Sequence, residues 1–179
     1  MAEKQWNGVK STASIAGHPI HPILIPFPIA FLVGAFLTDI GYWVTQDAFW
    51  ARASLWLVAA GVVSGAVAAI FGLTDFLTIR RAREHAAGWI HFLGNAFALS
   101  LGLISWIMRT GDPAQAVVPW GIIFTGVITL ALVVTGWFGG ELAYRHRIGV
   151  VGHEQQQNQA RSRPTEAGEE EREEEREYT

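Results

Sequence analysis

The sequence contains no cysteine, and charged residues make up only 16% of its 179 residues. The absence of cysteine excludes disulfides, thiol catalysis and cysteine-ligated iron–sulphur clusters within this chain. A Ser/His/Asp arrangement, a phosphate-binding glycine loop and a metalloprotease motif are also missing from the sequence. No basic stripe with interleaved aromatic residues is present, so we expect no nucleic-acid partner. Because half of the residues are hydrophobic, the composition predicts an integral membrane protein whose main partner is the lipid bilayer.

Long hydrophobic runs are abundant. Four apolar stretches lie at about residues 23–44, 53–79, 86–108 and 117–142. Each is close to or longer than the ~20 residues that a spanning helix needs, and backbone groups in hydrocarbon must be satisfied internally. Because the joints between them are short, successive helices are expected to be antiparallel neighbours. We therefore predict an all-α fold, with four transmembrane helices in an up-down-up-down bundle over residues 20–152.

The first apolar stretch has a proline-rich entry. The His-Pro pairs at 18–19 and 21–22 push the residue before each proline out of the helical region. Proline is tolerated in the first turn of a helix, so the first helix is predicted to begin between Ile23 and Pro26. Residues 1–19 then form a cytoplasmic N-terminal segment.

The basic residues predict the orientation. In the four-helix topology only Arg52 and Arg109 fall on the side away from the two chain ends. The other side holds Lys4, Lys10, Arg80, Arg81, Arg83, Arg145 and Arg147. By the positive-inside rule both termini are expected in the cytoplasm. The N-terminal residues lack the pattern of a cleaved signal peptide, so we expect none.

The last residues, 153–179, carry nine glutamates and four arginines and almost no apolar side chains. Such a segment cannot bury enough apolar surface to offset the entropy of ordering. We predict a disordered, acidic cytoplasmic tail, for which a solubilising role is favoured over a docking role.

All the histidines fall on the predicted cytoplasmic side, where Asp75 and Glu141 also arrive. They are His18, His21, His85, His91, His146 and His153. Two imidazoles facing each other across a bundle suit haem iron, whereas imidazoles with carboxylates suit a divalent ion such as iron, zinc or manganese. The haem hypothesis takes His21 and His91 as the ligand pair. The metal hypothesis takes five ligands, His18, His21, His91, Asp75 and Glu141. We predict no catalytic residue.

Structural interpretations of the same residues stay open. For His85, His146 and His153 we favour hydrogen bonding at the membrane interface. For Asp75 the structural interpretation is a pairing with Arg80 or His91, and for Asp39 it is interfacial hydration or a partner such as Arg52 or Arg109. For His91 structure and function stand level, because it shares a face with a stripe of small residues expected to line the bundle interior. The stripes are Gly61, Gly65, Ala68 and Gly72 on the second helix and His91, Asn95, Ala98 and Gly102 on the third.

Several motifs also support a family resemblance. The segments GHPIHPILIPFPIAFLVGAFLTDIGY (17–42), GLTDFLTI (72–79), 91–95 and GWFGGELAYRHRIGV (136–150) resemble the bacterial membrane protein family known as domain of unknown function 2231. The resemblance implies a small four-helix protein of the bacterial inner membrane. Some members of the family look fused to, or paired with, Rieske-type iron–sulphur domains, which hints at redox work, although this chain has no cysteine and no such domain. The family's motif positions here are His18, Pro19, His21, Pro22, Asp39, Asp75, His91, Asn95, Gly140, Glu141 and Tyr144, and the family attaches no role to them.

Two hypotheses for function follow. The first is a metal- or haem-binding, redox-associated subunit with a redox partner protein. The alternative is a structural or protein-interaction membrane protein, with a homo-oligomer as one form, that has no catalytic activity. A small transporter is less favoured, because the sequence has no inverted repeat.

Overall fold

The computed structural model describes residues 8–150. Its long helices are α2 (Pro26–Thr45), α3 (Ala48–Thr78), α5 (Ala86–Arg109) and α7 (Ile122–Gly140). The short elements are β1 (Ser14–Ile15), β2 (His18–Pro19), α1 (Ile20–Leu24), α4 (Arg80–Glu84), α6 (Pro113–Ala116) and the π-helical turns η1 (Val117–Gly121) and η2 (Glu141–Arg145).

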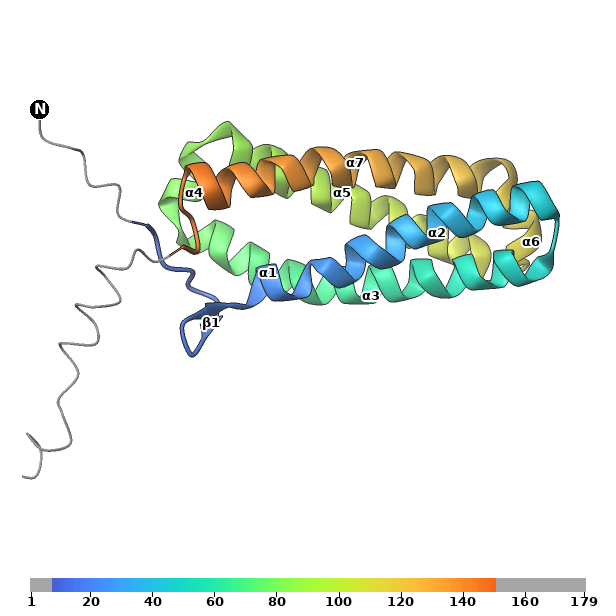
Figure 1. Cartoon of the computed structure of the whole chain (residues 1–179), viewed down its shortest axis with the longest axis horizontal. Helices are drawn as coiled ribbons and strands as arrows, with labels where there is room; N and C mark the ends of the chain where they lie inside the picture. The colour runs from blue at the N-terminus through green and yellow to red at the C-terminus, as the bar shows by residue number, and fades with distance from the viewer. Residues whose placement is uncertain (1–7, 151–179) are drawn as a thin grey trace, which may run out of the picture.

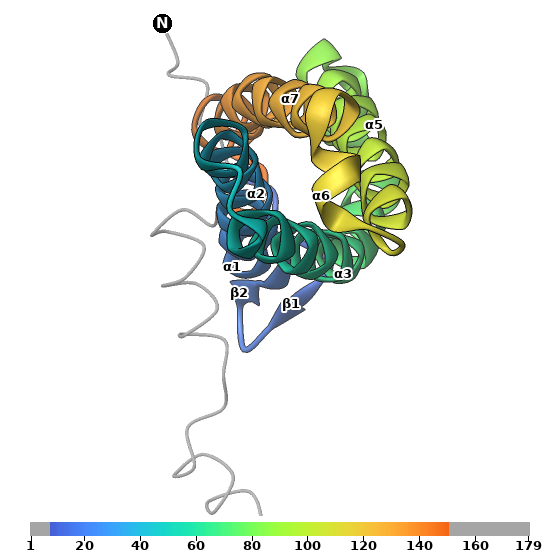
Figure 2. The same ribbon diagram turned by 90° about the vertical axis from the view of Figure 1, so that its right-hand side faces the viewer.

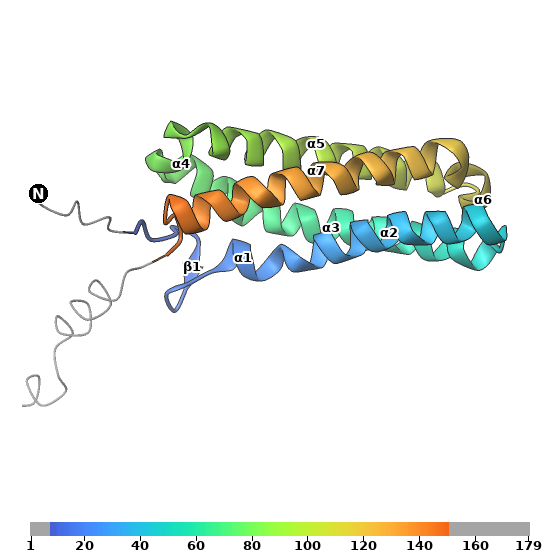
Figure 3. The same cartoon turned by 45° about the horizontal axis from the view of Figure 1, so that its top comes forward.

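The four long helices form one antiparallel bundle (Figure 1). Viewed along the bundle they form a ring in which α2 lies between α3 and α7, and α5 lies opposite α2 (Figure 2). The beginning and the end of the described chain meet at one end of the bundle, where Val9 pairs with Ile148. That end also holds α1 and α4, and α6 closes the opposite end (Figure 3). The predicted all-α, four-helix membrane bundle is thus confirmed.

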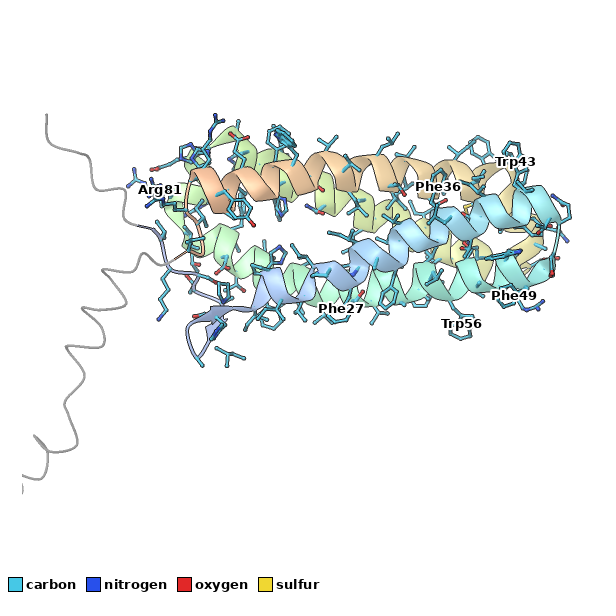
Figure 4. All side chains as sticks on the ribbon, viewed as in Figure 1. Phe27, Phe36, Trp43, Phe49, Trp56 and Arg81 are labelled. Carbon is cyan, nitrogen blue, oxygen red and sulfur yellow. The ribbon has the colours of Figure 1, made fainter. Side chains whose placement is uncertain are left out.

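The outer surface of the bundle is apolar. All four spans are long and hydrophobic enough to cross a membrane. Large side chains project outward from them, among them Trp43 and Trp56, which are 60% and 73% exposed (Figure 4). Leu130, in the middle of α7, is 69% exposed. A surface of this kind is suited to lipid rather than to water, so the chain is a multi-pass membrane protein.

The first helical segment begins earlier than predicted, at Ile20 rather than between Ile23 and Pro26. Pro19 is extended and caps α1, and Pro22 falls in its first turn, where the missing N–H needs no partner. Ile25 separates α1 from α2. As a consequence, His21 lies within a helical turn that faces the bundle.

The bundle interior is built from small residues. A Cβ on Gly61 would lie 2.6 Å from the Cγ of Leu32, and one on Gly102 would lie 3.2 Å from Val62. Ala68 and Ala98 are buried. The predicted small-residue stripes therefore face inward, where they allow the close helix approach that replaces hydrophobic attraction in lipid.

Candidate functional site

Two histidines face each other at the end of the bundle that holds the chain ends. His21 lies on α1 and His91 in the second turn of α5. Their ring centres are 6.1 Å apart and the ring planes are nearly perpendicular, at 88°. The sequence named these two residues as a facing pair, and the structure brings them together across the bundle.

Each imidazole is fixed by a backbone carbonyl of the next helix. The Nδ1 of His21 is 2.9 Å from the carbonyl oxygen of Ala68, and the Nδ1 of His91 is 2.8 Å from that of Thr135. Because a carbonyl only accepts, both Nδ1 atoms are the donors, and in the neutral imidazole each Nε2 then keeps its lone pair. Within residues 8–150 neither Nε2 has a hydrogen-bond partner. This is the tautomer and anchoring that metal-ligating histidines show.

Glycine makes room for each ring. A Cβ on Gly72 would lie 2.8 Å from the Nδ1 of His21, and one on Gly139 would lie 3.0 Å from the Nδ1 of His91. In both cases the glycine lies one helical turn after the carbonyl that holds the ring. The two imidazoles therefore pack against equivalent glycines, one on α3 and one on α7.

The surroundings of His91 carry two further polar groups. The amide of Asn95 donates to the carbonyl oxygen of His91 over 2.7 Å, and the hydroxyl of Thr135 contacts the Asn95 Oδ1 at 3.3 Å. Asn95 was expected on this face. Thr135 and Gly139 were not predicted, although the glycine-rich TGWFGG run at 135–140 is a signal that a bulky group packs there.

The five residues of the metal hypothesis are not brought together. His18 is exposed on β2, and its Nδ1 contacts the carbonyl of Ala16. Glu141 pairs with Arg145 at 3.2 Å. Within the described residues no group of three or more His, Asp or Glu side chains has the arrangement of a metal site.

Asp75 is hydrogen-bonded to the segment before β1. Its carboxylate accepts from the hydroxyl of Ser11 at 2.7 Å and from the backbone N–H of Ala13 at 2.9 Å. The expected partners, Arg80 and His91, are therefore wrong. The segment before β1 reaches this carboxylate because it folds back over the end of α3. The pattern of the helices alone does not reveal this fold-back.

A second polar centre lies at the opposite end of the bundle. Asp39 and Arg109 are fully buried and form an ion pair of 2.6 Å, as one of the two predicted pairings has it. The hydroxyl of Ser54 donates to Asp39 at 2.5 Å and that of Thr125 at 2.7 Å. Arg109 in turn donates to the hydroxyl and the carbonyl of Ser105. The three hydroxyl residues were not predicted, because serine and threonine are common in membrane helices without such a role.

His85 and His146 stack on each other at the histidine end, with ring centres 3.8 Å apart. Partial burial, followed by the neighbouring His85, lowers the pKa of His146 below its ordinary value, against the opposing effect of Glu141. This contact joins the start of α5 to the end of η2, which suits the predicted structural role. His153 and the predicted tail lie outside the described residues.

The comparisons with known proteins agree with this architecture. The model of a family described as "predicted membrane protein (DUF2231)" matches residues 17–152, a range that includes both polar centres. No curated protein and no solved structure matches the chain significantly. The family match confirms the resemblance noted in the sequence motifs. Since it covers well over half of the chain, the chain belongs to the DUF2231 family of predicted membrane proteins.

Proposed function

We propose that the protein is a haem-binding, redox-associated membrane subunit in which His21 and His91 would hold the haem iron. The observation that carries this proposal is the pair of facing imidazoles with protonated Nδ1 atoms and free Nε2 atoms. Sites of this kind are built in bundle cores from side chains on facing helices.

The number of protein ligands favours haem over a bare divalent ion. A zinc site needs three or four protein ligands, and here only two imidazoles converge among the described residues. A haem supplies four nitrogens of its own, so two histidines complete the coordination of its iron. When bound, haem supplies one-electron transfer. The carbonyls of Ala68 and Thr135 hold the ring orientation and raise the basicity of the ligand nitrogens.

The proposal includes a location and a partner. We place the protein in the bacterial inner membrane with the histidine end toward the cytoplasm. The described basic residues support this orientation, since Lys10, the arginines of α4, Arg145 and Arg147 belong to that end. Arg109, one of two exceptions, is neutralised by Asp39. A redox partner protein would then approach from the cytoplasm. A homo-oligomer stays a prediction.

The test is the cofactor content of the full chain purified in mild detergent, by absorption spectrum and elemental analysis. His21→Ala and His91→Ala are compared with His18→Ala, whose imidazole is exposed and outside the pair. We expect a Soret band and iron in the wild type and in His18→Ala, and their loss in the other two. A colourless, metal-free wild type would overturn the proposal. The edge-to-face contact of the rings would then be packing alone, as in the structural alternative.

A further inference from the structure

The buried faces of α2 and α5 repeat in the same register. The buried residues of α2 are Pro28, Leu32, Ala35 and Asp39, and those of the last four turns of α5 are Ala98, Gly102, Ser105 and Arg109. Each residue of the first set has its counterpart 70 positions later in the second. The same shift of 70 takes His21 to His91.

The second helix of each hairpin repeats in the same way. A shift of 67 takes Ser54, Val58, Gly61 and Ala68 of α3 to Gly121, Thr125, Ile128 and Thr135, which are all buried in η1 and α7. It also takes Gly72, which packs against the His21 ring, to Gly139, which packs against the His91 ring. The shift falls from 70 to 67 because Asp39 and Ser54 are 15 positions apart, whereas their counterparts Arg109 and Gly121 are 12 positions apart.

The chain is therefore built from two equivalent helical hairpins, α1 to α3 and α5 to α7. Because both hairpins run in the same order and α2 lies opposite α5, the two are related by an approximate two-fold axis along the bundle (Figure 2). Both polar pairs join equivalent positions across this axis, His21 with His91 at one end and Asp39 with Arg109 at the other. The first pair is identical in its residues, and the second is opposite in charge.

Two equivalent hairpins create an ambiguity in assembly. Membrane helices insert before they associate, so the first hairpin of one chain can meet either its own second hairpin or the first hairpin of another chain. The register of the buried positions does not distinguish these pairings, because it is the same in both hairpins. The residues at positions 39 and 109 do distinguish them. A pair of first hairpins would bury two aspartates together, and a pair of second hairpins would bury two arginines.

We propose that the Asp39–Arg109 pair is the specificity element that directs the first hairpin to the second hairpin of the same chain and rejects pairing between like hairpins. The neighbouring residues are adapted to the charge that each hairpin carries. Ser54 donates to Asp39. A Cβ on its counterpart Gly121 would lie 2.6 Å from the carbonyl oxygen of Ala116 and 2.7 Å from the guanidinium of Arg109, so glycine leaves room for both. The proposal does not depend on a haem.

The test uses the absence of native cysteine. In the native bundle Leu32 meets Gly102 across the axis, with 3.8 Å from the Leu32 Cδ2 to a Cβ built on Gly102. In a pair of first hairpins residue 32 would meet residue 32 of the other chain. The full chain with Leu32→Cys therefore forms a disulfide between chains on mild oxidation only where like hairpins pair.

We expect little cross-linked dimer with Leu32→Cys alone and a several-fold increase when Asp39→Asn and Arg109→Gln are added. A cross-linked fraction that does not change would overturn the proposal. The charge exchange Asp39→Arg with Arg109→Asp, combined with Ser54→Gly, provides the second measurement. It should return the cross-linked fraction to the low level of Leu32→Cys alone. Cross-linking at the level of the neutral variant would contradict the proposed role of charge, whether or not the neutral variant is well folded.

Discussion

At the scale of single residues, backbone carbonyls fix the orientation of the His21 and His91 imidazoles. Ala68 and Thr135 each accept from an Nδ1, which leaves the Nε2 lone pairs of His21 and His91 for a ligand. At the other end, the hydroxyl groups of Ser54 and Thr125 donate to Asp39, so that the buried carboxylate has hydrogen-bond partners in place of water. Both centres thus depend on a second layer of groups that fixes the first.

Asp39→Asn tests the buried ion pair. The change leaves the Arg109 charge buried without a counter-ion, so we expect the free energy of unfolding to fall by about 3–5 kcal/mol. Thr125→Val removes one charge-assisted hydrogen bond, which typically contributes about 1.5–3 kcal/mol. Both are measured by denaturation in detergent. The control is Glu84→Gln, which breaks an exposed pair with Arg80 and should cost about 0.5 kcal/mol or less. Equal losses in all three variants would contradict this account.

Residue patterns predicted that His21 and His91 lie close together. They also named Arg109 as one of two candidate partners for Asp39. They did not predict the carbonyls of Ala68 and Thr135, because every residue has a carbonyl and side-chain identity says nothing about which one is used. Asp75 was assigned to the wrong partners for a related reason. Its partner Ser11 lies 64 positions earlier, in a segment without periodicity. Long-range contacts of irregular segments are not encoded in a local pattern.

At the scale of elements, glycines on α3 and α7 determine how deeply the imidazoles can sit. We expect Gly139→Ala to displace the His91 ring, since the new Cβ would lie 2.9 Å from its Cε1. The amount of haem bound per chain should then fall, while the helix content is retained. The control on the same helix is Gly136→Ala, where a Cβ meets nothing within 4 Å. There alanine should keep the haem and add up to about 1 kcal/mol of stability through helix propensity. The same loss of haem in both variants would contradict the proposed role of Gly139 in making room for the His91 ring.

The contact between η2 and the start of α5 should make stability depend on pH. The pKa of His146 is lowered in the folded state, chiefly by partial burial and then by His85, so folding favours the neutral ring. Its contribution is therefore complete above the ordinary value of 6.5 and is lost as the pH falls below it. The charged neighbours Arg81 and Arg145 act in the same direction, and Glu141 opposes them.

We predict that the thermal midpoint decreases between pH 7 and pH 5, and that His146→Gln removes part of this decrease. His18→Gln, which changes an exposed histidine, is the matched control. An identical pH profile in the wild type and in His146→Gln would show that this contact does not titrate.

At the scale of the whole molecule, the fold follows from the lengths of the apolar stretches and the shortness of the joints. The four helices were predictable because hydrocarbon admits few other spanning structures. The twofold repeat was not predicted. Most of its matched positions hold different residues, such as Asp39 and Arg109 or Ser54 and Gly121, and only their shared burial reveals the relation.

The membrane orientation can be measured with single cysteines, because the native chain has none. Gln46→Cys lies in the exposed joint between α2 and α3, and Lys10→Cys is exposed at the histidine end. With a membrane-impermeant maleimide on cells whose outer membrane is permeable, we expect labelling of the first and not of the second. Labelling of Lys10→Cys alone would reverse the orientation and would place the histidine pair at the outer face.

The histidine pair is tested most directly by titrating the purified, cofactor-free full chain with haem and recording the absorption spectrum. We expect saturation at one haem per chain, with a spectrum typical of two nitrogen ligands from the protein, and no saturable binding in His21→Ala or His91→Ala. Failure of the wild type to bind haem, or binding that survives both substitutions, would contradict the proposal.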